Sequence, residues 1–309
     1  MIEITATAES IEQAKKLMDA GVDVIYAGED KFGLRLPHSF EREELRELVE
    51  VVHEAGKKIT VAVTGIMHPE KMKDIPEYLA FLKEIGVDQI EIGDAGILYV
   101  MKRDQLMLPF IYNTQMTITN DRQINFWGKR GAVKAVLGRE VPYEEMKAMV
   151  PTVKIPVEVL VYGATCIHQS LRPLIKNYFN FIQMDEAQSA VDRKRGLFLS
   201  EPKKPETHYS IYEDQHGTHI FATNDIDLMK ELPLVAQFPF NHWKLDGLFT
   251  PGDAFVQIAR CFVQAKEAIE NGEWNEEMAN EYDEIICSLH PAERDLDTGF
   301  FYYNVDDVK

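Results

Sequence analysis

Long apolar runs are missing from this sequence. Its 309 residues contain no stretch of the roughly 18 consecutive apolar residues that a membrane-spanning helix needs. The first ten residues, MIEITATAES, have neither the basic segment nor the apolar core of a secretory signal peptide. We therefore expect a cytoplasmic protein that does not bind membranes.

Cysteine is scarce as well. The chain has three, Cys166, Cys261 and Cys287, which are far apart and odd in number. This argues against a disulfide framework and favours a reducing compartment. The sequence also has no HExxH motif, no close cysteine pair and no GxGxxG after a predicted strand. These absences argue against a zinc site and against dinucleotide binding.

Basic residues are outnumbered by acidic ones. The 33 Lys and Arg residues stand against 51 Asp and Glu residues, so the formal net charge is −18. A surface this acidic is soluble and repels phosphate backbones. We do not expect the chain alone to bind nucleic acid tightly.

What the sequence does have is a regular alternation of short β-rich segments and longer amphipathic segments. Such an alternation predicts a parallel sheet, because parallel neighbours need a helical crossover. Continuous apolar runs such as VDVIYA and ITVAV are typical of strands covered on both faces. The predicted class is α/β, as a TIM-type (β/α)8 barrel, with an open doubly wound sheet as the alternative. The eight strands are expected at residues 2–4, 24–27, 58–63, 89–92, 110–113, 133–137, 157–161 and 242–245.

The regular alternation of strands and helices ends after the seventh predicted strand. We expect a barrel domain over residues 1–270, with an insertion over about residues 166–240 between strands seven and eight. The insertion includes a predicted hairpin that turns at residues 215–217. Residues 271–309 form a C-terminal extension that packs on the barrel. Three histidines are expected on a solvated face of the hairpin rather than at a metal: His208, His216 and His219.

Polar residues follow the predicted strand ends, which meet at one face of such a barrel. Arginine side chains there could grip a small carboxylate through two parallel hydrogen bonds. The alternative is that these arginines pair with Glu140, Glu158 and Asp246 inside the barrel. The candidate ligand-binding residues are Arg35, Asn113, Gln115, Arg139, Tyr162, Arg172, Lys244 and Asp246.

Three residues are candidates for catalysis. Cys166 and His168 are close in sequence, and an imidazole beside a thiol is the pattern of a cysteine nucleophile. Glu140, after the sixth strand, is the third candidate. The alternative for Cys166 is that it is a small buried apolar residue, as free cysteines commonly are.

Eight segments of the chain also match a set of known motifs in the right order. They include GVDVIYAGEDKFGLRL, IYNTQMTITN, GREVPYEEM, VEVLVYGATC and HWKLDGLF. These segments resemble motifs of the collagenase-like peptidase family, and the resemblance extends over about residues 1–270. The eight segments are residues 21–36, 38–45, 53–63, 111–120, 138–146, 157–166, 213–229 and 242–249.

The chain departs from this family at the cysteines that resemble iron–sulfur ligands in other members. Cys166 is kept, but Pro173 stands at the next cysteine position. The segment LFLSEP after Arg195 and Gly196 also lacks a cysteine. A cluster needs about four thiolates, so we expect this chain to hold none.

The resemblance implies two different functions. The name of the family implies a peptidase, yet several members act in prephenate-dependent or oxygen-independent hydroxylation, including 5-hydroxyuridine formation at the tRNA wobble position. Short members without the cluster cysteines look like partners of a longer, cysteine-bearing paralogue. The resemblance thus implies a subunit of a tRNA hydroxylation system that reaches tRNA through a complex, with prephenate as a candidate co-substrate. A peptidase and a non-catalytic scaffold are the alternatives.

Overall fold

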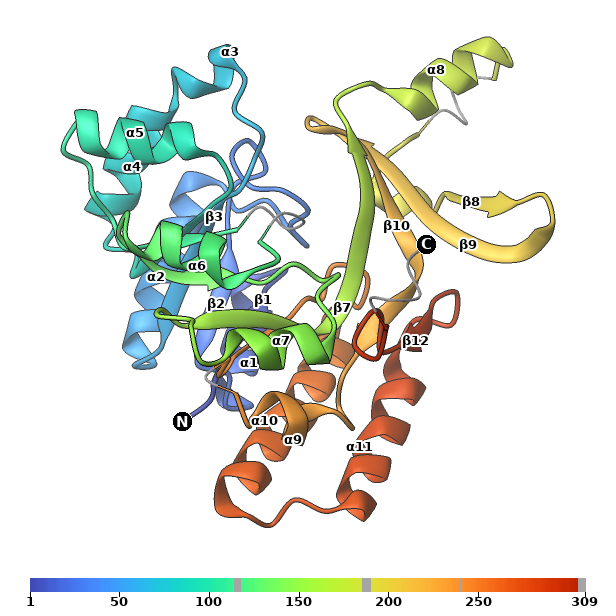
Figure 1. Ribbon diagram of the computed structural model, residues 1–309. Coiled ribbons are helices and arrows are strands. Elements are labelled where there is room, and N and C mark those ends of the chain that lie inside the picture. Colours follow the sequence, from blue (N-terminus) through green and yellow to red (C-terminus); the bar gives the residue numbers. More distant parts are fainter. Residues whose placement is uncertain (114–117, 185–189, 239, 305–309) are drawn as a thin grey trace.

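The computed structural model describes residues 1–113, 118–184, 190–238 and 240–304. Eight parallel strands form a closed barrel with helices around it (Figure 1). The barrel closes because β11 pairs in parallel with both β1 and β7. The predicted barrel is confirmed, and the open sheet is wrong. The barrel strands are β1 (Glu3–Thr7), β2 (Val24–Ala27), β3 (Lys58–Val63), β4 (Gln89–Ile92), β5 (Phe110–Tyr112), β6 (Ala132–Val136), β7 (Val157–Ser170) and β11 (His242–Leu245).

The helices that connect the strands bury an apolar face and begin at polar caps. In α2, Leu45, Leu48 and Val52 are spaced about one turn apart and are buried against the barrel. Ser10 caps α1 by accepting a hydrogen bond from the backbone N–H of Gln13. The helices of this layer are α1 (Ile11–Asp19), α2 (Arg42–Glu54), α3 (Pro69–Met72), α4 (Ile75–Glu84), α5 (Ala95–Arg103), α6 (Asp121–Gly128), α7 (Tyr143–Met149) and α10 (Gly252–Asn271).

The strand β7 is longer than its apolar pattern predicted. We expected it to end at Val161, but it continues to Ser170. Its second half leaves the barrel and pairs antiparallel with β10, which satisfies its backbone hydrogen bonds there. This half is partly exposed and polar, so its sequence does not show the continuous apolar run of a buried strand.

The insertion forms an arm that extends away from the barrel in Figure 1. The predicted hairpin is confirmed, since β9 ends at Asp214 and β10 begins at Gly217. Gly217 has φ +95°, and a Cβ atom there would lie 2.0 Å from the carbonyl oxygen of Ser170. The close approach of β10 to β7 therefore requires glycine. The arm contains α8 (Leu174–Phe181), a 3-10 turn (Arg193–Arg195), β8 (Phe198–Glu201), β9 (Lys204–Asp214) and β10 (Gly217–Asp227), and the chain then returns to the barrel in α9 (Leu232–Val235), which packs on α10.

The C-terminal segment returns to the barrel and to the arm. Helix α11 (Glu276–Leu289) packs on α10, and β12 (Asp295–Asp297) pairs in parallel with β10. Phe301 is buried and lies 5.3 Å, between ring centroids, from Tyr143 of α7. Within the described ranges, none of the helices combines the length and the apolar character needed to cross a lipid bilayer.

Asp227, at the end of β10, makes folding stability depend on pH. Burial raises the pKa of this carboxyl to about 7, and the nearby Asp283 and Glu231 add to the shift. A raised carboxyl pKa stabilises the fold fully below the unfolded pKa of about 4, and this stabilisation is lost as pH rises toward 7. Asp227→Asn should therefore unfold with a flatter pH dependence.

Between about pH 4.5 and pH 8, we expect wild type to lose about 2–4 kcal/mol of unfolding free energy relative to the Asn variant. Urea denaturation at several pH values measures this. Asp253→Asn is a suitable control because its side chain is 71% exposed. Parallel stability curves for wild type and Asp227→Asn would contradict the analysis.

Candidate functional site

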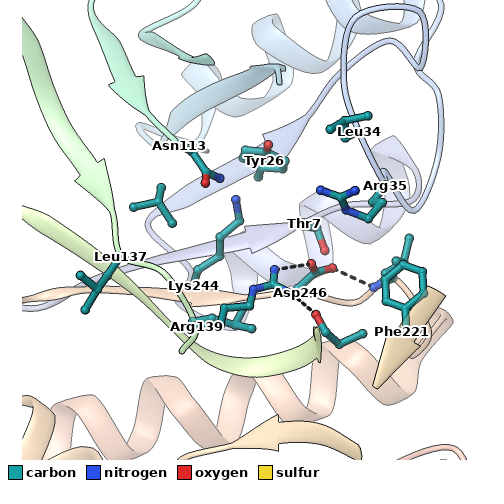
Figure 2. Close-up of a pocket in the computed structure, with 14 residues that line it drawn as sticks. Thr7, Tyr26, Leu34, Arg35, Asn113, Leu137, Arg139, Phe221, Lys244 and Asp246 are labelled. Atoms are coloured by element: carbon teal, nitrogen blue, oxygen red, sulfur yellow. Dashed lines mark hydrogen bonds and ion pairs between the residues drawn. The ribbon is translucent and has the colours of Figure 1, made fainter. Parts of the chain in front are cut away.

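The carboxyl ends of the barrel strands surround a polar pocket. Figure 2 shows side chains from strands β1, β2, β10 and β11 and from the loops after β2, β5, β6 and β11 converging on it. Five of the predicted ligand-binding residues line this pocket: Arg35, Asn113, Arg139, Lys244 and Asp246.

Two cavities of different size open at this face. The narrow cavity on the barrel axis has about 20 Å³ of free space, which is enough for about one water molecule. The neighbouring cavity has about 340 Å³, which is in the size range of small-molecule sites. Both cavities are lined by Leu34, Arg35 and Asn113, so a ligand in the wide cavity would reach the entrance of the narrow one.

Below the narrow cavity, a buried ionic network crosses the inside of the barrel. Lys244 of β11 lies 3.2 Å from Glu91 of β4 and 3.8 Å from Glu158 of β7. Glu158 also accepts a hydrogen bond from Lys134 of β6 at 2.7 Å. All four side chains are at most 8% exposed. Lysines, rather than the predicted arginines, are therefore the partners of Glu158.

The network fixes the floor of the pocket. Glu91 accepts hydrogen bonds from the Tyr26 hydroxyl at 2.9 Å and from the Asn113 amide at 2.6 Å. The Lys244 ammonium lies 3.5 Å from the centre of the Tyr26 ring, which adds a cation–π contact. Because these groups are already engaged, they shape the pocket more than they attract a ligand.

Arg35 is the cation that faces the wide cavity. It has φ +53°, a left-handed conformation that is strained for a residue with a side chain. The loop holds it there, since the N–H of Leu34 donates to Thr64 Oγ1 at 3.0 Å. Its guanidinium donates to Gln169 Oε1 at 2.8 Å, and no carboxylate among the described residues forms an ion pair with it. Arg35 thus contributes a charge that an anion could neutralise.

Arg139 is held at the mouth by two neighbouring groups. Its guanidinium donates to the carbonyl oxygen of Ala164 and lies 3.8 Å from Asp246 (Figure 2). Burial lowers the pKa of Arg139, an effect that Asp246 opposes and the charge of Arg35 reinforces. Two guanidinium groups therefore share this mouth with two carboxylates: Asp246 beside Arg139, and Asp94, which lines the wide cavity and accepts a hydrogen bond from the N–H of Gly96 at 2.7 Å.

The histidines of the arm are not on a solvated face, so that expectation is wrong for two of them. His216 is 3% exposed and His219 is fully buried, because the arm folds over the loop after β2. His216 Nε2 contacts the carbonyl oxygen of Asp30 at 2.6 Å. His219 Nε2 lies 2.9 Å from Asp214 Oδ1. Only His208 is partly exposed, and it stacks on Phe198.

The imidazole beside Cys166 is that of His219, not of His168. Cys166 pairs with Phe221 and His168 with Ile220, so two steps along β7 correspond to one step along β10. The side chain of His168 is exposed at this bulge, whereas that of Cys166 is only 8% exposed. The predicted pair of Cys166 and His168 is therefore wrong.

Electrostatics link Cys166, His219 and Asp214. The Sγ–H of Cys166 donates to the carbonyl oxygen of His168 at 3.3 Å. Burial would raise the pKa of this thiol, but the influence of His219 and the charges of Arg35 and Arg139 lower it overall. Burial would lower the pKa of His219, but hydrogen bonds with Asp214 and Cys166 raise it. The three side chains form a thiol, imidazole and carboxylate series. In the sequence, the spacing of His216 and His219 and the presence of Asp214 in the segment 213–229 were signals for the imidazole and the carboxylate. Only the pairing of β10 with β7 brings that segment to the strand of Cys166.

The other predicted site residues lie elsewhere. Tyr162 is buried, and its hydroxyl contacts Thr250 and His290 away from the pocket. Arg172 and Glu140 are exposed and line neither mouth cavity, so their assignment to the site is wrong. Gln115 lies outside the described residues.

The cysteines do not fit an iron–sulfur cluster. Cys166 lies at the barrel mouth, whereas Cys261 and Cys287 lie in α10 and α11. A cluster needs about four thiolates on one site. In the part of the chain that the structure describes, no three His, Cys, Asp or Glu side chains gather in a group that could hold a metal ion.

Removing Glu91 should destabilise the fold. Glu91→Ala would leave the buried Lys244 with only the more distant Glu158, so we expect a loss of about 3–5 kcal/mol in unfolding free energy. Glu77→Ala removes an exposed carboxylate and should cost less than about 1 kcal/mol. Urea denaturation of both variants tests this, and equal small losses would show that the network is not held by Glu91.

Known proteins are similar to this chain over nearly its whole length. Residues 9–308 match the family model described as Peptidase family U32. The chain is 33% identical over 301 residues to tRNA hydroxylation protein P2 of Bacillus subtilis, with 97% of each chain covered. It is 25% identical over 312 residues to tRNA hydroxylation protein P1 of the same strain, covering 97% of this chain and 70% of P1. One organism thus has a short and a longer relative of this chain.

The fold also has a solved counterpart. The structure of the U32 peptidase Mk0906 superposes with a TM-score of 0.52 at 14% identity, covering 80% of this chain and 92% of that one. At this identity the likeness concerns the fold. The family match over nearly the whole chain and the identity to P2 confirm the resemblance seen in the sequence motifs: the chain belongs to peptidase family U32.

Proposed function

We propose that this protein is a subunit of a tRNA-modifying system that hydroxylates the wobble uridine to 5-hydroxyuridine with prephenate as co-substrate. The similarity to tRNA hydroxylation protein P2 over 97% of both chains carries the proposal. The mouth of the barrel supports it, because the wide cavity has the size of a small-molecule site and Arg35, which lines it, forms no ion pair with a carboxylate of the described residues.

The wide cavity is the part of the mouth that would hold the carboxylate. With about 340 Å³ it has room for a small molecule, whereas the axial cavity has not. Arg35 lines both cavities without an acidic partner among the described residues, and Arg139 stands behind it. A guanidinium binds a carboxylate through two parallel hydrogen bonds.

We further propose that the protein works with a longer, cysteine-bearing paralogue. The pair P2 and P1 in one Bacillus subtilis strain is the model for this partnership. A net charge of −18 favours a division of labour in which the partner makes most contacts with tRNA. The partner would also hold any iron–sulfur cluster, because this chain has three dispersed cysteines.

A peptidase is the second candidate, and one observation favours it. Cys166, His219 and Asp214 stand in the order of a nucleophile, a base and an orienting carboxylate. A non-catalytic scaffold is the third candidate and would leave the trio without a role.

Deleting the gene should lower 5-hydroxyuridine in tRNA. Mass spectrometry of tRNA nucleosides measures this, and a plasmid copy should restore the nucleoside. Arg35→Ala should restore it poorly, whereas Arg46→Ala, an arginine on the outer helix α2, should restore it fully. Unchanged 5-hydroxyuridine, even in a strain that also lacks the longer paralogue, would rule out the proposed function.

The purified protein should bind prephenate through Arg35. A shielded guanidinium–carboxylate pair contributes about 1.5–3 kcal/mol, so Arg35→Ala should weaken binding roughly ten- to a hundredfold in calorimetric titration. Arg35→Lys should also bind poorly, because an ammonium lacks the planar fork.

Arg139 separates a ligand role from a structural one. If Arg139→Ala lowers the melting temperature by several degrees while wild type gives no heat with prephenate, the arginine is a structural partner of Asp246. The carboxylate site should then be abandoned. Arg46→Ala is the control for the loss of a surface charge.

A further inference from the structure

Cys166 faces the same cavity as Arg35. It lies on the part of β7 that leaves the barrel, where it contributes to the wall of the wide cavity together with Arg35 and Gln169. On its other side it packs in an apolar cluster with Phe221 and Leu248. The thiol is therefore held by apolar contacts and by a hydrogen bond from its Sγ–H to the carbonyl oxygen of His168 at 3.3 Å, and it shares the cavity with the cation Arg35.

The proton arrangement around His219 fits a base for this thiol. Because the Asp214 carboxylate accepts, the Nε2–H of His219 donates to it across 2.9 Å. The Nδ1 atom then carries the lone pair, and it lies 3.4 Å from Arg35 Nη1. Cys166 is opposite Phe221 in the pairing of β7 with β10, two residues from His219, and the two side chains influence each other's pKa. The backbone N–H of His216 donates to Asp214 Oδ1 at 2.7 Å and so fixes the carboxylate.

We propose that Cys166 is a catalytic nucleophile that adds to the ketone carbon of a small 2-oxo carboxylate, with His219 as its base and Arg35 holding the carboxylate group. The proposal rests on the proposed carboxylate site and adds a covalent step to it. His219 Nδ1 takes the thiol proton, and the sulfur forms a bond to the ketone carbon. The C=O π pair moves to oxygen, which receives the proton back from His219. The product is a thiohemiketal, and the reverse steps release it, so no oxidant or reductant is needed.

The three cysteines of the chain differ in a way that supports this assignment. Burial raises the pKa of Cys261 to about 11, and it also raises the pKa of Cys287. Cys166 is buried too, yet its pKa is lowered, because His219, Arg35 and Arg139 surround it. A thiol with only a packing role would lack these partners.

The cavity favours a small 2-oxo acid over a peptide. A peptide carbonyl carries no charge, whereas a 2-oxo acid has a carboxylate directly beside its electrophilic carbon. Arg35 and Cys166 line one cavity of about 340 Å³, so a carboxylate on the guanidinium leaves the adjacent ketone on the side of the sulfur.

The test uses 3-bromopyruvate, a carboxylate that alkylates thiolates by displacing bromide, and iodoacetamide as its neutral counterpart. Peptide mass spectrometry follows all three cysteines in the same sample, with the exposed Cys287 as the internal control. Near neutral pH, Cys166 should prefer 3-bromopyruvate over iodoacetamide at least tenfold more than Cys287 does. Arg35→Ala should remove this preference, and Arg46→Ala should not.

Two further variants separate the base from its orienting partner. His219→Gln should slow alkylation of Cys166 by both reagents about equally, because it removes the base and leaves the anion site. Asp214→Asn should shift the pH midpoint of Cys166 alkylation upward, an effect that loss of a merely structural contact would not give. Unchanged rates and an unchanged pH profile in both variants would overturn the assignment.

The covalent step has its own readout. Carbon-13 NMR of wild type with pyruvate labelled at the ketone carbon should show a new signal in the tetrahedral carbon region, absent in Cys166→Ala. If no such signal forms and Cys166 reacts no faster than Cys287, the nucleophile proposal falls.

If Cys166→Ala also keeps full 5-hydroxyuridine in vivo, the proposal falls while the tRNA function stands. A reactive Cys166 together with unchanged tRNA in the deletion strain would instead support the nucleophile and exclude the tRNA function.

Discussion

The second half of β7 continues beyond the barrel wall, and β10 pairs with it antiparallel. The rest of the candidate site depends on this pairing. It brings Asp214 and His219, more than forty residues after Cys166 in the sequence, to the carboxyl face of the barrel. It also presses the arm onto the loop after β2, where His216 contacts the backbone of Asp30. Gly217 permits the approach because any side chain there would collide with Ser170.

The inside of the barrel imposes a second constraint. Glu91, Glu158, Lys134 and Lys244 occupy positions that apolar side chains usually fill. Each buried charge is tolerated because an opposite charge and further hydrogen bonds surround it. Since these groups satisfy one another, the charges that remain at the mouth are those of Arg35, of Arg139 with Asp246, and of Asp94. The proposed binding of an anion at the mouth thus depends on this layer being paired within itself.

Arg35 lies where the arm, positioned by the pairing of β7 with β10, adjoins the barrel mouth above the ionic layer. Its loop is anchored to β3 through Thr64, and its guanidinium lies between the barrel mouth and the arm, in contact with Gln169 and near His219. Its left-handed backbone conformation is strained, and such strain persists where the surroundings fix it and where function uses it. A ligand at this position would contact the barrel and the arm at once.

The sequence by itself determined the barrel. The strands at 24–27, 58–63, 89–92 and 242–245 coincide with the predicted ranges, because apolar runs and helix caps are local signals. It also determined that Arg35, Asn113, Arg139, Lys244 and Asp246 meet, since strand ends converge on one face of any such barrel.

Only the tertiary structure decided which side chains touch. The bulge in β7 separates His168 from Cys166, and the antiparallel pairing with β10 supplies His219 in its place. Arg172 and Glu140 follow strand ends in sequence but face solvent, because the chain turns outward there. Bulges, strand extensions and buried hairpin faces depend on contacts between segments far apart in the chain. Local periodicity carries no information about such contacts, and for that reason the thiol, the imidazole and the carboxylate were found only in the folded protein.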